Sequence, residues 1–123
     1  MSGNRLFVDT NILIYLLNGD SEIAELLDRK QLIISFITEL ELLSISNLDD
    51  AEYQIIVDLI GQCQVINVNS EIKDLTVGLR KSRKLKLPDA IIAATAIYSK
   101  LPILTADRAF ERVEELNVIL YEN

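Results

Sequence analysis

One stretch, RLFVDTN at residues 5–11, carries the pattern that decides the fold. Its beginning is a short, largely apolar run, which is typical of a strand buried on both faces of a sheet. The run ends on Asp9, and a helical pattern over 12–17 follows almost at once. The stretch therefore predicts a buried strand over 5–9 that ends on an acid and leads into a helix.

The same alternation of apolar runs and helical segments continues along the chain. Further strands are predicted over 32–35, 65–68, 103–105 and 118–121, and helices over 12–17, 21–28, 38–46, 49–62, 70–84, 88–100 and 107–114. Strands that alternate with helices favour a parallel sheet with helices on both sides. No repeat and no linker rich in Pro, Gly or Ser interrupts the pattern. We therefore expect an α/β fold and a single domain over residues 1–123.

The composition excludes several kinds of chemistry. The chain has 123 residues, of which 50% are apolar, so it can bury a core without a disulfide. It contains no histidine, which excludes Ser–His–Asp and Cys–His nucleophiles and histidine-bound zinc. Cys63 is the only cysteine, and the longest apolar run is far shorter than the ~18 residues of a membrane span. We expect a cytoplasmic protein with no membrane segment and no signal peptide.

The charges are unevenly placed along the chain. A net charge of −7 opposes non-specific binding to nucleic acid. A basic run, however, covers the end of the 70–84 helix and the residues after it. Such a run is usually a solvated surface, but its position just before Asp89 also suits contact with phosphates. The residues predicted to contact phosphates are Arg80, Lys81, Lys84, Lys86 and Arg108.

Four acids stand close to the predicted ends of strands or starts of helices. Asp9 ends the first strand, Glu41 lies on the helix after the second, Asp89 begins a helix, and Asp107 follows the fourth strand. Ligands of parallel α/β sheets bind at the carboxyl ends of the strands. The map of elements therefore allows all four acids to converge.

Three of these acids also have a purely structural interpretation. Asp9 and Asp107 have the positions of helix N-caps. Asp89 follows Pro88, and an acid after a proline is typical of a first helical turn. These alternatives stay open when each acid is considered alone.

Glu41 must be distinguished from its neighbour Glu39. At about 100° per residue, Glu39 is predicted to face solvent and Glu41 to point inward. An inward carboxylate needs a metal or hydrogen-bond donors to compensate its charge. The structural alternative is a capping box, because Thr38-x-x-Glu41 has the required spacing.

A cluster of carboxylates suits a hard divalent cation. Mg²⁺ takes oxygen ligands, keeps several waters and is commonly held by acids together with a substrate phosphate. Without a cation, clustered acids would raise one another's pKa. Asn11 is placed to support the Asp9 carboxylate, and Thr105 to donate a hydroxyl hydrogen bond to a neighbouring acid.

Four motifs, taken in order, resemble those of PIN-domain ribonucleases, and in particular the short VapC-type toxins of toxin–antitoxin pairs. The motifs are FVDTN at 7–11, SxxTxxEL at 35–42, LPDAIIAA at 87–94 and LTxDxxF at 104–110. Each motif is weak alone, but the ordered set spans nearly the whole chain. The resemblance implies a three-layer α/β/α sandwich with a central, mainly parallel sheet.

The resemblance also implies an activity and a set of residues. It implies cleavage of single-stranded or structured RNA that depends on Mg²⁺ or Mn²⁺. The positions that match the family's catalytic and metal-binding acids are Asp9, Glu41, Asp89 and Asp107, and the supporting positions are Thr10, Asn11 and Thr105. Such toxins usually form homodimers and are blocked by an antitoxin peptide in a groove near the site. The apolar segments 12–17 and 23–27 would form the walls of that groove, or else belong to the core.

Two other functions are weighed against this one. A phosphohydrolase of the haloacid-dehalogenase type carries an aspartate two residues after its nucleophile, but this chain has Asn11 there and lacks a lid-sized insertion. A non-catalytic PIN-like module that binds RNA or protein would be expected to have lost some of the acids, and all four are present.

Overall fold

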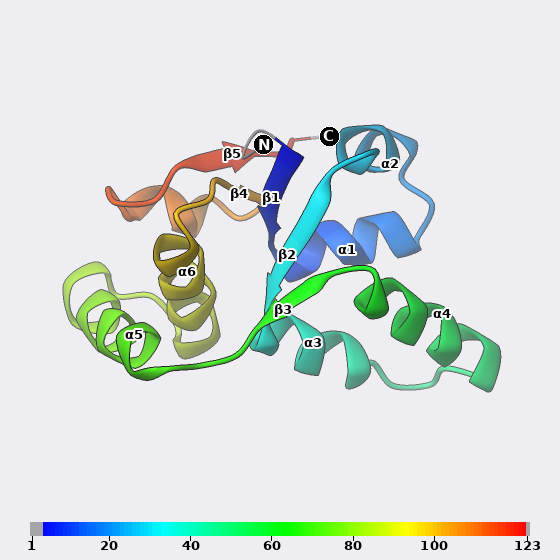
Figure 1. Cartoon of the computed structure of the whole chain (residues 1–123), viewed down its shortest axis with the longest axis horizontal. Helices are drawn as coiled ribbons and strands as arrows, with labels where there is room; N and C mark the ends of the chain where they lie inside the picture. Colours follow the sequence, from blue (N-terminus) through cyan, green and yellow to red (C-terminus); the bar gives the residue numbers. More distant parts are fainter. Residues whose placement is uncertain (1–3, 123) are drawn as a thin grey trace.

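The computed structural model describes residues 4–122, which form a five-stranded parallel sheet with helices on both faces (Figure 1). The strands are β1 (Arg5–Val8), β2 (Gln31–Ser35), β3 (Gln64–Ile66), β4 (Ile103–Thr105) and β5 (Val118–Leu120). Their order in the sheet is β3-β2-β1-β4-β5, and all four pairs are parallel. The predicted α/β sandwich with a parallel central sheet is confirmed.

Six α-helices and one 3₁₀ helix connect the strands. They are α1 (Thr10–Leu17), α2 (Ser21–Leu27), α3 (Phe36–Leu43), α4 (Asp50–Gly61), α5 (Ser70–Arg83), α6 (Leu87–Ser99) and the 3₁₀ helix η2 (Arg108–Arg112). In Figure 1, α5 and α6 lie on one side of the sheet, and α1, α2 and α4 lie on the other. No helix among residues 4–122 is long and apolar enough to cross a membrane.

Alternate residues of the central strands pack into two separate hydrophobic cores, one on each face of the sheet. Phe7, Ile33 and Ile103 point to the core shared with α5 and α6. Val8 and Ile34 point to the opposite core, shared with α1, α2 and α4. Because side chains alternate along a strand, a strand buried on both faces must be apolar throughout. This is the pattern that RLFV at 5–8 shows.

Helix α1 begins at Thr10, two residues before its predicted start, and two further helices differ more from the sequence prediction. The helix predicted over 38–46 begins at Phe36, because the Ser35 hydroxyl accepts a hydrogen bond from the Ile37 amide and caps the helix at the very end of β2. The helix predicted over 107–114 is the shorter η2. Its backbone hydrogen bonds join residues three apart, as in Val113 to Phe110, so this turn is 3₁₀ rather than α.

Candidate active site

The predicted acids lie around the carboxyl ends of the neighbouring strands β1 and β4. Asp9 directly follows β1, and Asp107 comes two residues after β4 ends. Glu41 lies in α3 and Asp89 in the first turn of α6, and these two helices pack against each other. The arrangement gathers four short segments, far apart in sequence, at one end of the sheet (Figure 1).

Asp9 is a buried carboxylate with two donors. Its side chain accepts the backbone N–H of Thr10 at 2.8 Å and the hydroxyl of Thr105 at 2.7 Å, one on each oxygen. Burial nevertheless raises the pKa of Asp9 from 3.8 to about 6; the two hydrogen bonds oppose this rise, and the charges of Asp89 and Asp107 add to it. Asp9 is the N-cap of α1, so its structural interpretation is correct. A capping role does not by itself explain why this carboxylate is buried beside other acids.

Thr105 connects two of the acids. Its hydroxyl donates to Asp9 and accepts the backbone N–H of Asp107 at 3.0 Å. The expectation that this hydroxyl supports a neighbouring acid is therefore met. The Asp107 carboxylate accepts the N–H of Ala109 at 2.9 Å and caps η2. One oxygen of Asp107 thus has a structural partner, while the residue stays in the site.

Glu41 is tethered to the site but exposed. Its Oε1 accepts the hydroxyl of Thr10 at 2.6 Å, which draws the carboxylate toward Asp9. The prediction that Glu41 points inward is wrong: Glu41 is exposed and Glu39 is half-buried. The helical period correctly selected Glu41 as the acid of α3 that reaches the site. It did not show that this side of α3 is open to solvent.

The capping box proposed for Thr38 and Glu41 does not form. Ser35 caps α3 instead, and Thr38 lies inside the helix. The Thr38 hydroxyl is fully buried and lies 2.9 Å from the Thr10 hydroxyl. Sequence reasoning therefore missed Thr38 as part of the site. The sequence did carry a signal for Thr38. A threonine one helical turn before an acid can contact another side chain of the site as readily as it can cap a helix.

Asp89 is the acid without a hydrogen bond, since no donor from residues 4–122 is bonded to its carboxylate. Burial is the largest cause that raises its pKa, followed by the charge of Asp107, while Lys86 lowers it and Glu41 raises it. Asp9 in turn is affected by Asp89 and Asp107. The charges of the other predicted acids therefore act on the two carboxylates whose pKa is raised, Asp9 and Asp89.

The donor set fits a hard divalent cation better than any other ligand. Every candidate ligand is a carboxylate oxygen, and burial, together with the charges of neighbouring acids, raises the pKa of Asp9 and Asp89, an effect that a bound cation would oppose. Among residues 4–122, no three acids or cysteines are close enough to enclose an ion by themselves. Mg²⁺ needs no such enclosure, because it usually keeps several waters and takes only one or two carboxylates.

Asn11 does not have the contact predicted for it. It is exposed on α1, and the two donors of Asp9 come from Thr10 and Thr105 instead. Thr10, the residue directly after Asp9, donates its backbone N–H to the carboxylate, because Asp9 caps the helix that starts at Thr10. A supporting role for Asn11 toward a bound ligand stays a prediction.

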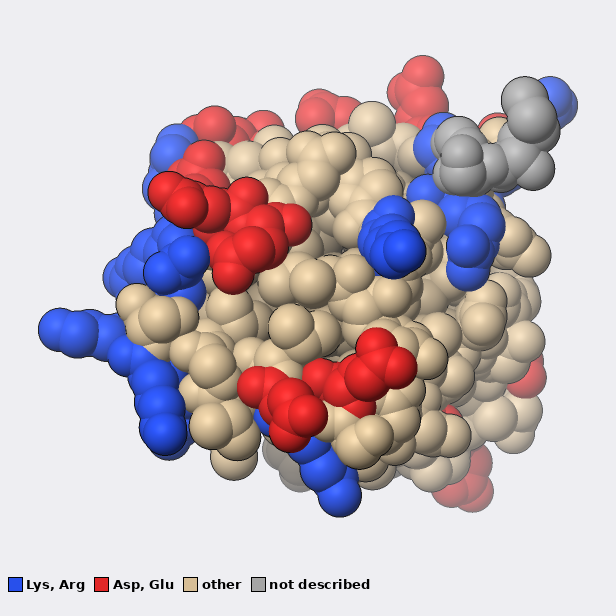
Figure 2. Space-filling view, turned by 60° about the vertical axis from the view of Figure 1, so that its left-hand side comes forward, with Lys and Arg blue, Asp and Glu red and all other residues tan. Residues whose placement is uncertain are grey.

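The basic run forms an exposed surface at the end of α5. Arg80, Lys81, Lys84 and Lys86 are exposed, and Arg80 also donates to the carbonyl of Leu85 at 3.5 Å. Figure 2 shows basic side chains along the left edge of one face, directly beside a group of acidic side chains, with further basic side chains toward the right. Arg108 differs, because it forms ion pairs with Glu111 and Glu122 and is less available for a phosphate.

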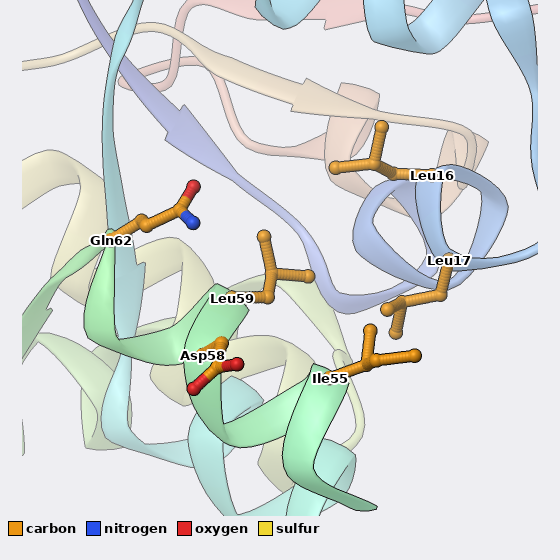
Figure 3. Close-up of a pocket in the computed structure, with 6 residues that line it drawn as sticks. All are labelled: Leu16, Leu17, Ile55, Asp58, Leu59 and Gln62. Atoms are coloured by element: carbon orange, nitrogen blue, oxygen red, sulfur yellow. The ribbon is translucent and has the colours of Figure 1, made fainter. Parts of the chain in front are cut away.

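An apolar groove lies between α1 and α4. Leu16 and Leu17 of α1 approach Ile55 and Leu59 of α4 around a pocket of about 350 Å³ (Figure 3). A second pocket of about 490 Å³ adjoins it and shares Leu17 and Ile55. Ile55 is 57% exposed.

The walls of this groove differ in part from those predicted from the sequence. The outer side of the 12–17 segment does line it, but Ile12 and Leu13 are wholly buried in the core. Ile23 and Leu27 of the 23–27 segment also belong to the core. The second wall is α4, which the sequence analysis did not name. The pattern of the 23–27 segment could not show whether its apolar residues line a groove or lie in the core.

Comparison with known families decides the assignment. Residues 6–116, which include all four acids, match the profile of the PIN domain. The chain belongs to the PIN-domain family. This membership replaces the haloacid-dehalogenase alternative.

Solved structures and a characterised relative support the same placement. A toxin–antitoxin complex from Klebsiella pneumoniae contains a chain 33% identical to this PIN domain, with a TM-score of 0.83 and coverage of 96% of this chain and 99% of that one. VapBC2 from Rickettsia felis, bound to a DNA fragment from its promoter, shares the fold at 22% identity and a TM-score of 0.79, covering 96% and 99%. Ribonuclease VapC2 of Methanocaldococcus jannaschii is 27% identical over 97% of this chain and 95% of its own.

Proposed function

We propose that this PIN-domain protein is a metal-dependent endoribonuclease and the toxin of a toxin–antitoxin pair. The observation that carries the proposal is the gathering of Asp9, Glu41, Asp89 and Asp107 at one end of the sheet, where burial and the charges of Asp89 and Asp107 raise the pKa of Asp9 to about 6. Such a cluster is costly to maintain unless it binds a cation. The similarity to the Klebsiella pneumoniae toxin–antitoxin complex and to Ribonuclease VapC2 supports the same activity.

The four acids would hold one or two Mg²⁺ or Mn²⁺ ions. When bound, the ion lowers the pKa of a water and offsets charge on the scissile phosphate. The chain's own part is to place the carboxylates. Thr105 orients Asp9, and Thr10 orients both Asp9 and Glu41, through the hydrogen bonds described above.

The exposed basic residues at the end of α5 supply the positive charge for RNA binding that the acidic site lacks. The four acids repel RNA until they are neutralised, so the phosphates on either side of the cut need cations elsewhere. Arg80, Lys81, Lys84 and Lys86 are exposed, and the charge of Lys86 acts on Asp89, so we assign this contact to the four residues. Replacing Lys81 and Lys84 with alanine should make cleavage less sensitive to salt.

The direct test is cleavage of defined RNAs by the purified protein. We expect internal cuts in single-stranded or loop regions with Mg²⁺ or Mn²⁺, and none after chelation with EDTA. Titration calorimetry with Mn²⁺ provides an independent measure of binding. Intact RNA together with no heat of Mn²⁺ binding would instead indicate a non-catalytic PIN-like module.

The apolar groove between α1 and α4 is the proposed seat of the antitoxin. An apolar segment of a partner would cover Leu16, Leu17 and Ile55, which are otherwise left partly open to water. The partner would be encoded by a small neighbouring gene with a DNA-binding N-terminus. Ile55→Asp should abolish co-purification with that partner and leave RNA cleavage unchanged, and loss of cleavage in this variant would contradict the assignment.

We also propose that the protein works as a cytoplasmic homodimer. This follows from the similarity to VapC-type toxins, which usually pair. Sedimentation equilibrium over a range of concentrations should give the mass of two chains, and a single-chain mass throughout would contradict the proposal.

A further inference from the structure

A chain of two threonine hydroxyls leads from the core of the protein to Glu41. Thr10 Oγ1 lies 2.6 Å from Glu41 Oε1 and 2.9 Å from Thr38 Oγ1. A carboxylate offers only acceptor oxygens, so the single hydroxyl proton of Thr10 is directed to Glu41. Thr10 must then accept from Thr38. The hydrogen bonds therefore run in one direction, from Thr38 through Thr10 to Glu41.

Thr10 is also the point where two acids are tied together. Its backbone N–H donates to Asp9, while its hydroxyl donates to Glu41. Rotation of its side chain would release Glu41 from Asp9. The partner that fixes this rotation is Thr38, which is 0% exposed, so water cannot take its place.

Thr38 differs from other buried threonines in the helices. The hydroxyls of Thr76 and Thr95 donate at 2.7 Å to the carbonyl four residues earlier in their own helices. These are ordinary ways to satisfy a buried hydroxyl within a helix. The Thr38 hydroxyl is instead directed across to α1, which indicates a role outside α3.

We propose that Thr38 is a positioning residue of the metal site, which acts through the Thr10 hydroxyl to hold Glu41 beside Asp9. The inference rests on the proposed function, because it assumes that Glu41 and Asp9 share a cation. Hydrogen bonds in series strengthen one another, so loss of the first weakens the second. A supporting partner of a ligand usually contributes about 10- to 100-fold in metal affinity, and Thr38 is one step further away.

The test uses three single variants that separate the hydroxyl from the shape of the side chain. Thr38→Val removes the hydroxyl and keeps the volume, and Thr38→Ser keeps the hydroxyl. Thr76→Val makes the same chemical change at a buried helical threonine outside the site. Mn²⁺ affinity is measured by electron paramagnetic resonance without RNA, cleavage by kcat and KM, and folding by circular dichroism.

We expect Thr38→Val to weaken Mn²⁺ affinity about three- to ten-fold and to lower kcat with little change in KM. Thr38→Ser and Thr76→Val should bind Mn²⁺ like the unmodified protein. Thr10→Val should weaken binding further, and adding Thr38→Val to it should have no additional effect. Additive losses in this double variant would overturn the inference.

Two further outcomes would also overturn it: wild-type Mn²⁺ affinity in a folded Thr38→Val, or equal losses in Thr38→Ser and Thr38→Val. The proposed function fails separately. If the protein binds Mn²⁺ but cuts no RNA, the ribonuclease proposal falls, while the effect of Thr38→Val on Mn²⁺ affinity still decides the role of Thr38.

Discussion

The side of the site built on β1, β4 and α3 holds its carboxylates by hydrogen bonds, whereas the side built on α6 does not. Asp9, Glu41 and Asp107 each accept at least one hydrogen bond from a threonine or a backbone amide. Asp89 accepts none from residues 4–122. The positive charge that acts on it is that of Lys86, a long and flexible side chain.

This difference indicates two roles. Hydrogen-bonded carboxylates are positioned before a ligand arrives, so they define where a cation binds. A carboxylate without donors keeps its freedom to rotate and gains a partner only from the ligand. We therefore expect Asp9 to matter for structure and chemistry together, and Asp89 for chemistry with little effect on structure.

The largest expected effect is that of Asp9→Asn on cleavage. The change removes a central charge but keeps the size and the hydrogen-bonding oxygen, so cleavage should fall about 10³-fold. Single-turnover cleavage with Mn²⁺ measures the loss. Asp74→Asn, at an exposed acid of α5, is the matched control and should cut normally. Undiminished cleavage by Asp9→Asn would remove Asp9 from the mechanism.

The same substitution should stabilise the metal-free protein, and more so as the pH rises. Between pH 3.8 and about 6, folded Asp9 binds more protons than unfolded Asp9, so the wild-type stability falls as the pH increases through this window. A pKa that moves from 3.8 to about 6 corresponds to about 3 kcal/mol.

Urea unfolding of both proteins in EDTA, at intervals from pH 4 to pH 7, measures this effect. The stability gained by Asp9→Asn should be smallest at pH 4 and should level off above pH 6. A difference that stays constant over the range would show that the buried charge of Asp9 costs nothing in the fold.

Asp89→Asn should separate chemistry from structure. Cleavage should fall about 10²-fold, since one ligand charge is lost. The unfolding midpoint should change less than in Asp9→Asn, because Asp89 is less buried and its charge is therefore less costly in the folded protein. Parallel cleavage assays and thermal unfolding check this pair of results. A stability change as large as that of Asp9→Asn would erase the distinction between the two sides.

The smallest effect is expected from Thr105→Val. The change leaves one oxygen of Asp9 and the amide of Asp107 without their partner, so Mn²⁺ affinity should fall about ten-fold. The stability should fall by about 1 kcal/mol. Thr105→Ser should restore both quantities, and calorimetry measures the affinity. Failure of serine to restore binding would indicate that the methyl group, not the hydroxyl, is what the site needs.

The sequence was enough to predict the layers of the fold, because burial on both faces leaves a continuous apolar run such as RLFV. It also placed the acids at the correct end of the sheet. Helix ends were harder: Ser35 both ends β2, where it pairs with Ile66 of β3, and caps α3, and a single segment does not show this pairing.

The finer geometry of the site depended on contacts between elements. Periodicity within one helix could not show that Glu41 would be exposed yet bound to Thr10, because the contact joins residues 31 positions apart. For the same reason, the sequence could not show that Thr38 pairs with Thr10, or that the donors of Asp9 are Thr10 and Thr105 rather than Asn11. Local patterns indicate which residues are available, while packing between helices decides which of them meet.

The hydrogen bond from Thr105 to Asp9 joins residues 96 positions apart and has a consequence for synthesis of the protein. Chains emerge from the ribosome N-terminus first, at roughly 5–20 residues per second. A nascent chain therefore displays Asp9 and Glu41 well before β4 arrives to lie beside β1. Until then the hydroxyl that orients Asp9, and Asp107 itself, are missing. A nascent chain that has not yet reached β4 therefore lacks both groups, and the site is complete only after Asp107 has emerged.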